Sequence, residues 1–279
     1  MGEEKELETM LRSRQETNRV GGLKGWLEDN FPELSFSLRR AKWYLEPRGW
    51  HSRRMIRNYK NLHAGERCFI IGNGPSLNKM DLHPLAGEIT FSLNRGYLYY
   101  DRIGEPCTYL VSVNAYVMRQ FAEEILALDN TRFLAWGCRR LFPIDDRIGF
   151  IAGPTRNDPP RFSTDVTRDI WGGATVTYVA MQLAYYMGFK QAILIGVDHR
   201  FATKGDPHTL VTSEGDDPNH FAPGYFGKGV KWQLPDLETS ELAYTLARDA
   251  YAADGREILD ATVDGKLTVF PKVHYEDLF

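Results

Sequence analysis

Three asparagines in this sequence each stand where a predicted strand ends. Asn73 lies in the glycine turn Gly72-Asn73-Gly74-Pro75-Ser76, which closes the apolar run at 67–72, and Asn94 and Asn114 follow the runs at 88–93 and 108–113. Side-chain amides can hydrogen-bond a ribose or a phosphate without carrying charge. Together the three asparagines indicate a nucleotide site, although any single one is equally typical of a turn.

The glycine turn has a chemistry of its own. Gly72 and Gly74 would let backbone N–H groups approach a phosphate closely, and Ser76 can cap a following helix whose start favours negative charge. The turn lacks the third glycine of a dinucleotide fingerprint, because Leu77 stands there, and it lacks the lysine of a P-loop. It therefore predicts phosphate binding, with a structural tight turn as the alternative.

A second polar cluster, Asp198-His199-Arg200, follows the continuous apolar run at 191–197. His199 and Arg200 can contact a leaving phosphate, and the guanidinium would supply donors in a fixed geometry. Asp198 could orient the loop or a ligand. The alternative is a helix-capping aspartate with exposed neighbours.

The stretch 201–234 is long, poor in helix signals and rich in glycine and aromatic residues. Segments of this length inside compact domains are usually lids, binding loops or disorder, and we expect this one to be a lid that orders over a substrate. His220 is its candidate general base, because imidazole titrates near neutrality. A surface histidine without a function is the alternative, and it applies more strongly to His208.

Metal-binding motifs are missing from the sequence. It contains no DxD, HxxxH or HExxH, and its acidic pairs Asp145-Asp146 and Asp216-Asp217 are adjacent residues, which point to opposite faces of a strand. We therefore expect no dedicated metal site and no cofactor.

These residues need a sheet whose strands all end at one edge. Apolar runs predict strands at 67–72, 88–93, 108–113, 132–136, 191–197, 257–262 and 267–270, and helical signals cover 115–128, 175–187 and 238–253. This alternation predicts an α/β fold, with a Rossmann-like, mainly parallel sheet flanked by helices. Ligands of such sheets bind beyond the carboxyl ends of the strands, where the polar clusters stand.

Composition excludes several classes of protein. Of the 279 residues, 43% are hydrophobic and 25% are charged, which excludes a wholly disordered or fibrous chain. The formal net charge of −3 argues against bulk nucleic-acid binding. Three cysteines without a CxxC pattern fit a reducing cytosol. The acidic N-terminus lacks the apolar segment of a secretory signal, so we expect a cytoplasmic protein.

Residues 1–62 differ from the rest of the chain and are predicted to form a helical extension to a catalytic domain at 63–279. Residues 39–60 carry eight Lys/Arg and one acid, with aromatic residues between them. Such a segment could dock on the anionic inner face of a membrane or on a lipid-linked acceptor. The alternative is a solvated extension that packs on the domain or on another subunit of a homo-oligomer.

With those residues laid out, a resemblance can be stated. The blocks FIIGNGPSLNKMDL, FSLNR and MGFKQAILIGVDHRF resemble the bacterial sialyltransferase family that uses CMP-activated sialic acid. They equally resemble a wider group on the same fold, which is found in surface-polysaccharide biosynthesis and flagellin glycosylation and carries the name of the archaeal 6-hydroxymethylpterin diphosphokinase. The resemblance covers roughly residues 65–279 and is specific for the superfamily rather than for one reaction.

The resemblance to the sialyltransferases implies roles for particular residues of the nucleotide side. Asn73 and Asn94 would bind the CMP part of the donor, Thr175 would contact the donor at the start of a helix, and Asp198 would close the nucleotide side. Arg200 stands where the family has a tyrosine that holds the phosphate.

The resemblance also indicates which residue acts as the general base. The family's catalytic histidine is the second one of a HYxGH-like segment. Here Asn219-His220-Phe221 matches the first histidine of that segment, whereas the second position falls near Gly224 or Tyr225. His220 is therefore our first candidate for the base, and His199 is the second.

Together these residues predict a metal-independent, inverting glycosyltransferase that moves a sialic-acid-like sugar from a CMP-activated donor to a glycan or lipid-linked acceptor. CMP leaves with less charge to neutralise than a nucleoside diphosphate, so protein donors can suffice. One alternative is a Mg²⁺-dependent diphosphokinase acting on 6-hydroxymethylpterin with ATP, whose pattern places aspartates after the third strand, where this chain has Ser112-Val113-Asn114. Another is a nucleotide-binding protein without catalysis.

Overall fold

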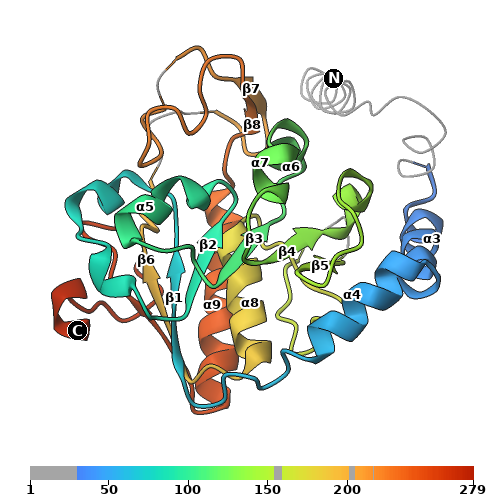
Figure 1. The fold of residues 1–279 in the computed structure, drawn as a ribbon, viewed down its shortest axis with the longest axis horizontal. Helices are drawn as coiled ribbons and strands as arrows, with labels where there is room; N and C mark the ends of the chain where they lie inside the picture. Colours follow the sequence, from blue (N-terminus) through green and yellow to red (C-terminus); the bar gives the residue numbers. More distant parts are fainter. Residues whose placement is uncertain (1–29, 154–158, 201–204, 216) are drawn as a thin grey trace, which may run out of the picture. The chain divides into compact units, whose positions relative to one another are not determined.

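The computed structural model describes residues 30–153, 159–200, 205–215 and 217–279. The chain divides into two units, Met1–Glu46 and Pro47–Phe279. Within the first unit, helix α3 (Pro32–Leu45) begins with a proline in its first turn and ends where Glu46 takes up extended backbone (Figure 1). The first 29 residues of the predicted extension lie outside the described residues.

The second unit is built on a seven-stranded sheet with the order β5-β4-β3-β2-β1-β6-β9. Figure 1 labels the strands from β5 to β6 in this order. The strands are β1 (Arg67–Ile71), β2 (Thr90–Leu93), β3 (Tyr109–Ser112), β4 (Thr131–Ala135), β5 (Ile148–Ile151), β6 (Gln191–Ile195) and β9 (Glu257–Asp260). All neighbouring pairs are parallel. The predicted Rossmann-like α/β fold is confirmed.

The central strands are almost wholly buried because both faces of the sheet are covered. Each residue of β2, β3 and β5 is buried, and so are the last four of β1 and of β6. Strands β2 to β5 follow one another on one side of β1, whereas β6 and β9 lie on its other side. The strand order therefore reverses between β1 and β6, and such a switch point is where open α/β sheets bind ligands.

Two long helices pack side by side against the sheet, α8 (Val176–Met187) and α9 (Leu237–Ala253) (Figure 1). Thr175 and Asp236 cap their starts, and α8 ends at Gly188, whose φ of 93° is a left-handed conformation that glycine adopts without strain. Both helices were predicted from the sequence, α8 with its end at this glycine.

Helix α4 (Pro47–Arg57) belongs to the second unit although it falls inside the predicted extension. It packs along β5, and its Ser52 hydroxyl accepts the backbone N–H of Phe150 at 3.0 Å. The boundary between the two units therefore lies before α4 rather than near residue 62.

Some predicted elements differ from the structure. The helix expected at 115–128 is broken at Phe121 (φ −128°) into α6 (Ala115–Gln120) and α7 (Ala122–Leu126). The strand expected at 267–270 is wrong, because this stretch joins no ladder and Lys272 alone forms an isolated bridge to Asp260. Strand β5 was not predicted, since Gly149 interrupts its apolar pattern.

The stretch 201–234 contains one small antiparallel pair, β7 (Leu210–Thr212) and β8 (Lys231–Gln233), joined by turns. Residues 201–204 and 216 lie outside the described residues, and we call the described remainder, 205–215 and 217–234, the lid segment. No helix in the described part of the chain is long and apolar enough to cross a membrane.

Candidate functional site

A cavity of about 620 Å³ lies beyond the carboxyl ends of the strands. Its wall is formed by the residues that follow β1, β2, β3 and β6, by the N-terminal turns of α8 and α9, and by the lid segment. Ten of the twelve predicted site residues line it: Gly72, Asn73, Gly74, Asn94, Asn114, Thr175, Asp198, His199, Arg200 and His220. Pro75 and Ser76 do not.

The glycines of the turn after β1 allow two loops to cross closely. A Cβ atom at Gly72 would overlap the carbonyl oxygen of Gly196, and one at Gly74 would overlap the carboxylate of Asp198. The N–H groups of Gly72 and Gly74 donate to the carbonyls of Ile195 and Gly196, at 2.7 and 2.9 Å. These two N–H groups are therefore engaged between the loops, as the tight-turn alternative expects, and phosphate binding by the turn stays a prediction.

Asp198 holds the same two loops together. Its Oδ2 accepts the hydroxyl of Ser76 at 2.5 Å, and its Oδ1 accepts the backbone N–H of Ser76 at 3.2 Å. Both residues are buried. Of its two predicted roles, the structure gives Asp198 the one of orienting a loop, and Ser76 is its partner rather than a ligand contact. The turn continues as a 3-10 helix, Pro75–Lys79, rather than an α-helix.

The three strand-end asparagines differ in how much of each amide is engaged. Asn73 donates from Nδ2 to the carbonyl of Leu93 at 2.9 Å, and its buried Oδ1 has no hydrogen-bond partner among the described residues. Asn94 has a φ of 50° and accepts the hydroxyl of Ser112 at 3.2 Å. Asn114 caps α6 through its Oδ1, as the turn alternative expected. The Nδ2 groups of Asn94 and Asn114 have no partner in the described part of the chain.

The N-terminus of α8 opens onto the cavity through an unusual turn. Gly173 and Ala174 both have left-handed backbone, with φ of 52° and 59°, directly before the capping residue Thr175. Thr175 Oγ1 accepts the N–H of Thr177 at 3.3 Å and the hydroxyl of Tyr244 at 3.4 Å, and burial raises the pKa of Tyr244. Helix N-termini favour anions, so this wall of the cavity suits a phosphate.

The lid segment is docked on the turn that carries Asn73. The N–H of Phe221 donates to the carbonyl of Asn73 at 2.9 Å, and Asn78 donates from Nδ2 to the carbonyl of Phe221 at 2.8 Å. Gln120 of α6 bonds both the N–H and the carbonyl of Lys231, each at 3.0 Å. These bonds place His220 in the cavity wall.

His220 forms a pair with Asp217, which the sequence analysis missed. Asp217 Oδ2 lies 2.6 Å from His220 Nδ1, and its Oδ1 accepts the N–H of Asn219 at 2.9 Å. A carboxylate at Nδ1 keeps the proton on that nitrogen and leaves a lone pair on Nε2. Within the described residues Nε2 has no hydrogen-bond partner. The three-residue spacing between aspartate and histidine was visible in the sequence.

The other two histidines of the cavity wall are engaged. His199 has a φ of 53°, and its Nε2 lies 2.9 Å from Glu241 of α9. His208 is exposed and lies 3.4 Å from Asp236. Burial acts in the opposite direction, but hydrogen bonds from Thr239 and His208 lower the pKa of Asp236.

Carboxylates are scarce at this site. Among the described residues, Asp198 is the only acid that lines the cavity, and no group of three or more His, Cys, Asp or Glu side chains could hold a metal ion. Among the described residues, Arg200 is the one lysine or arginine that lines the cavity, and its side chain is exposed. The site therefore presents amides, one guanidinium, a helix N-terminus and an imidazole.

Comparisons of the chain with protein-family models, curated proteins and solved structures found no significant match. The cavity and its residues are therefore the observations from which a function is inferred.

Proposed function

We propose that this protein is an inverting glycosyltransferase that moves a sialic-acid-like sugar from a CMP-activated donor to a glycan or lipid-linked acceptor in surface-polysaccharide biosynthesis. One observation carries the proposal: His220 lies in the same cavity wall as Asn73 and Asn94, with its Nδ1 bound to Asp217 and its Nε2 without a partner among the described residues. The resemblance of the sequence blocks supplies the donor class.

The nucleotide would bind at the switch point between β1 and β6. The Nδ2 groups of Asn94 and Asn114, which have no partner among the residues that the structure describes, would donate to the nucleoside. The N-terminus of α8 and Arg200 would face the phosphate, because both favour a negative charge. The glycines of the turn contribute shape, since their own N–H groups are occupied.

The reaction would be a direct displacement. His220 Nε2 takes the proton of the acceptor hydroxyl, and the acceptor oxygen forms a bond to the anomeric carbon. The bond between that carbon and the phosphate oxygen breaks, CMP leaves with the electron pair, and the configuration inverts. Asp217 stabilises the imidazolium that results.

The diphosphokinase alternative fits this cavity less well. Magnesium beside the phosphates of ATP is held by carboxylates. Asp198 is the only carboxylate that the described residues bring to the wall, and both of its oxygens face Ser76. At the end of β3, where that pattern needs acids, Asn114 caps α6.

The test is an assay of the full-length protein with CMP-sialic acid and a glycan acceptor, following transfer and CMP release. We expect both in the wild type, and both lowered by about 10²-fold or more in the variant His220→Asn. Magnesium-dependent AMP formation from ATP and hydroxymethylpterin would favour the diphosphokinase. A thermal shift with CMP but no turnover with CMP-linked nonulosonic or octulosonic acids would favour a protein that only binds nucleotides.

A further inference from the structure

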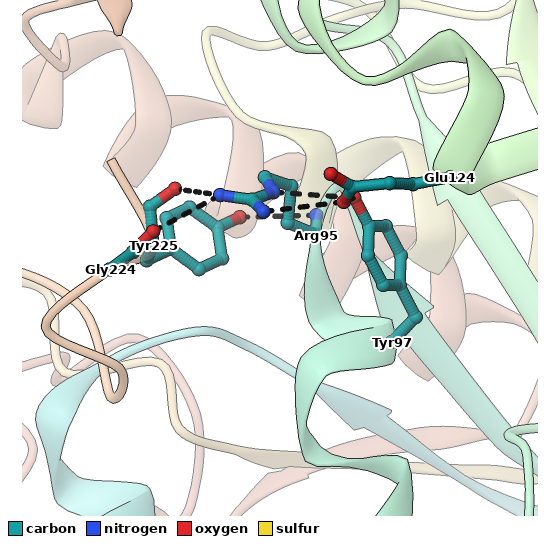
Figure 2. A network of polar contacts seen from close by, with 5 residues as sticks. All are labelled: Arg95, Tyr97, Glu124, Gly224 and Tyr225. Atoms are coloured by element: carbon teal, nitrogen blue, oxygen red, sulfur yellow. Dashed lines mark hydrogen bonds and ion pairs between the residues drawn. The ribbon is translucent and has the colours of Figure 1, made fainter. Parts of the chain in front are cut away.

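One buried arginine connects the nucleotide side of the cavity to the lid segment. Arg95 directly follows Asn94, yet its side chain does not line the cavity. Its Nη1 donates to the carbonyl of Gly224 at 3.2 Å and to the carbonyl of Tyr225 (Figure 2). The residue is only 7% exposed. Arg95 therefore binds a turn of the lid segment through two backbone carbonyls.

The guanidinium is also held by side chains outside the lid segment. Nη2 lies 3.3 Å from Glu124 of α7, and Nε donates to the hydroxyl of Tyr97 at 3.2 Å (Figure 2). That hydroxyl donates to Glu124 at 2.5 Å, and the ring of Phe121 lies 3.7 Å from the guanidinium carbon. A planar guanidinium with these partners has one orientation, so its remaining donors are aimed at the lid.

Arg95 contacts Tyr225 at two ends. The guanidinium binds the carbonyl of Tyr225, and the backbone N–H of Arg95 donates to its hydroxyl at 3.3 Å. The imidazole of His220 stacks on the ring of Tyr225, with 4.0 Å between ring centroids and an interplanar angle of 5°. Asp217 fixes the rotation of that imidazole, and Tyr225 fixes its plane.

We propose that Arg95 is a positioning residue that keeps the lid segment closed and keeps His220 in its plane without touching substrate. The role of His220 in this statement rests on the proposed function, whereas the closure of the lid does not. Loss of Arg95 lowers kcat, because His220 is no longer held in its plane. The affinity for the nucleotide is retained, because Arg95 does not line the cavity.

The closure is tested by hydrogen exchange on the full chain without ligand, comparing Arg95→Met with Arg256→Met. Arg256 is a matched control: it donates to the carbonyl of Tyr185 at 2.7 Å, lies 4.4 Å from that ring and pairs with Asp254 at 3.4 Å. It precedes β9, at the opposite end of the sheet.

We expect Arg95→Met to speed exchange in peptides spanning 219–226 by about tenfold or more, because bonds from a charged donor to two carbonyls are lost. Arg256→Met should leave those peptides unchanged. Equal exchange of the lid segment in the wild type and in Arg95→Met would overturn the closure.

The positioning role is tested by CMP release from CMP-sialic acid. We expect Arg95→Met to lower kcat by about tenfold or more while the Kd for CMP stays within about twofold. The kcat of Arg95→Lys should lie between those of the wild type and Arg95→Met, because an ammonium group keeps the charge but cannot bond all the partners of the guanidinium. A kcat equal to that of the wild type, beside a faster-exchanging lid, contradicts the positioning role.

Two further outcomes keep the proposals separate. If the wild type releases no CMP, the proposed function fails, and the exchange result still decides whether Arg95 closes the lid. If Arg95→Met does not fold, Arg95→Lys and Tyr225→Leu replace it, since Tyr225→Leu keeps the carbonyl and removes the stacking face. In Tyr225→Leu we expect reduced kcat; an unchanged kcat contradicts the positioning role.

Discussion

Two histidines at opposite ends of the sheet have closely similar surroundings. His63 precedes β1, and His220 lies in the lid segment beyond the carboxyl ends. In each, Nδ1 faces a carboxylate, Glu66 at 3.2 Å and Asp217 at 2.6 Å. Each imidazole stacks on an aromatic ring, with centroids 4.6 and 4.0 Å apart, and the two side chains are 14% and 13% exposed.

The difference is at the second ring nitrogen. His63 Nε2 lies 2.6 Å from the hydroxyl of Tyr109, at the start of β3, so both of its nitrogens are engaged. His220 Nε2 has no partner among the described residues, and His220 lines the cavity, which His63 does not. A free nitrogen beside a space for substrate, rather than the carboxylate or the stacking, therefore separates a candidate base from a structural histidine.

The largest expected effect comes from His220→Asn. Removing a general base that acts in the transition state lowers kcat by about 10²–10⁴-fold. The melting temperature should also fall by a few degrees, because the imidazole bonds the buried carboxylate of Asp217 and stacks on Tyr225, so turnover is compared per folded molecule. CMP release from CMP-sialic acid and thermal melts are the measurements.

The matched variant for this experiment is His63→Asn. Turnover per folded molecule should equal that of the wild type, since His63 does not reach the cavity. A His220→Asn protein with full turnover, or a His63→Asn protein that has lost it while folded, would reverse the two assignments.

Asp217→Asn should have the next largest effect. The amide keeps the size of the side chain but can donate to Nδ1, which permits the tautomer that carries its proton on Nε2. We expect kcat to fall by roughly 10–100-fold, as for other groups that orient a functional histidine. Glu66→Gln is the control, and because Glu66 is 52% exposed it should change neither kcat nor stability measurably. Equal kcat in Asp217→Asn and wild type would show that the pair does not set the tautomer.

The sheet could be predicted because its strands are buried on both faces. Within the predicted strands, residues 68–72 and 192–197 are apolar without interruption, and such runs indicate strands independently of distant contacts. The stretch at 267–270 is also mostly apolar but joins no ladder, although β9 is an edge strand and Lys272, just beyond the stretch, bridges to its last residue, Asp260. A pattern predicts the tendency to extend, whereas a ladder also needs the chain to run alongside a strand edge for several residues.

At the site, the positions of the polar residues could be predicted and their bonds could not. Asn94 and Asp198 had to lie at the carboxyl edge, because each follows a strand. Asp198 accepts the hydroxyl of Ser76, and Arg95 binds the carbonyls of residues 224 and 225. Both contacts depend on how the loops cross, which the local sequence does not determine. The pair of Asp217 and His220 is local, and its spacing was overlooked.

A smaller effect, on stability alone, is expected for His63→Asn. The imidazole bridges Glu66 and the hydroxyl of Tyr109, and its ring stacks on Phe189. Losing the bond to a partly buried phenol and part of the stacking should lower the free energy of unfolding by about 2 kcal/mol. Urea unfolding measures this change. A His63→Asn protein as stable as the wild type would show that the closed surroundings of His63 contribute nothing.

The smallest expected effect is that of Tyr109→Phe, which tests whether an imidazole nitrogen without a partner can act when it lies outside the cavity. Tyr109→Phe removes the hydroxyl that engages His63 Nε2 and keeps the ring, which contacts Phe91 at 4.9 Å between centroids. We expect a loss of about 1 kcal/mol in the free energy of unfolding, because one part-buried hydrogen bond is lost. His63 then has a free Nε2 like that of His220, but no cavity.

Tyr109→Phe combined with His220→Asn should therefore have no more turnover than His220→Asn alone. Urea unfolding and CMP release on the two single variants and the double variant test both statements. Restored turnover in the double variant would mean that a free imidazole nitrogen is sufficient wherever it stands, and the placement of His220 among Asn73 and Asn94 would no longer explain its role.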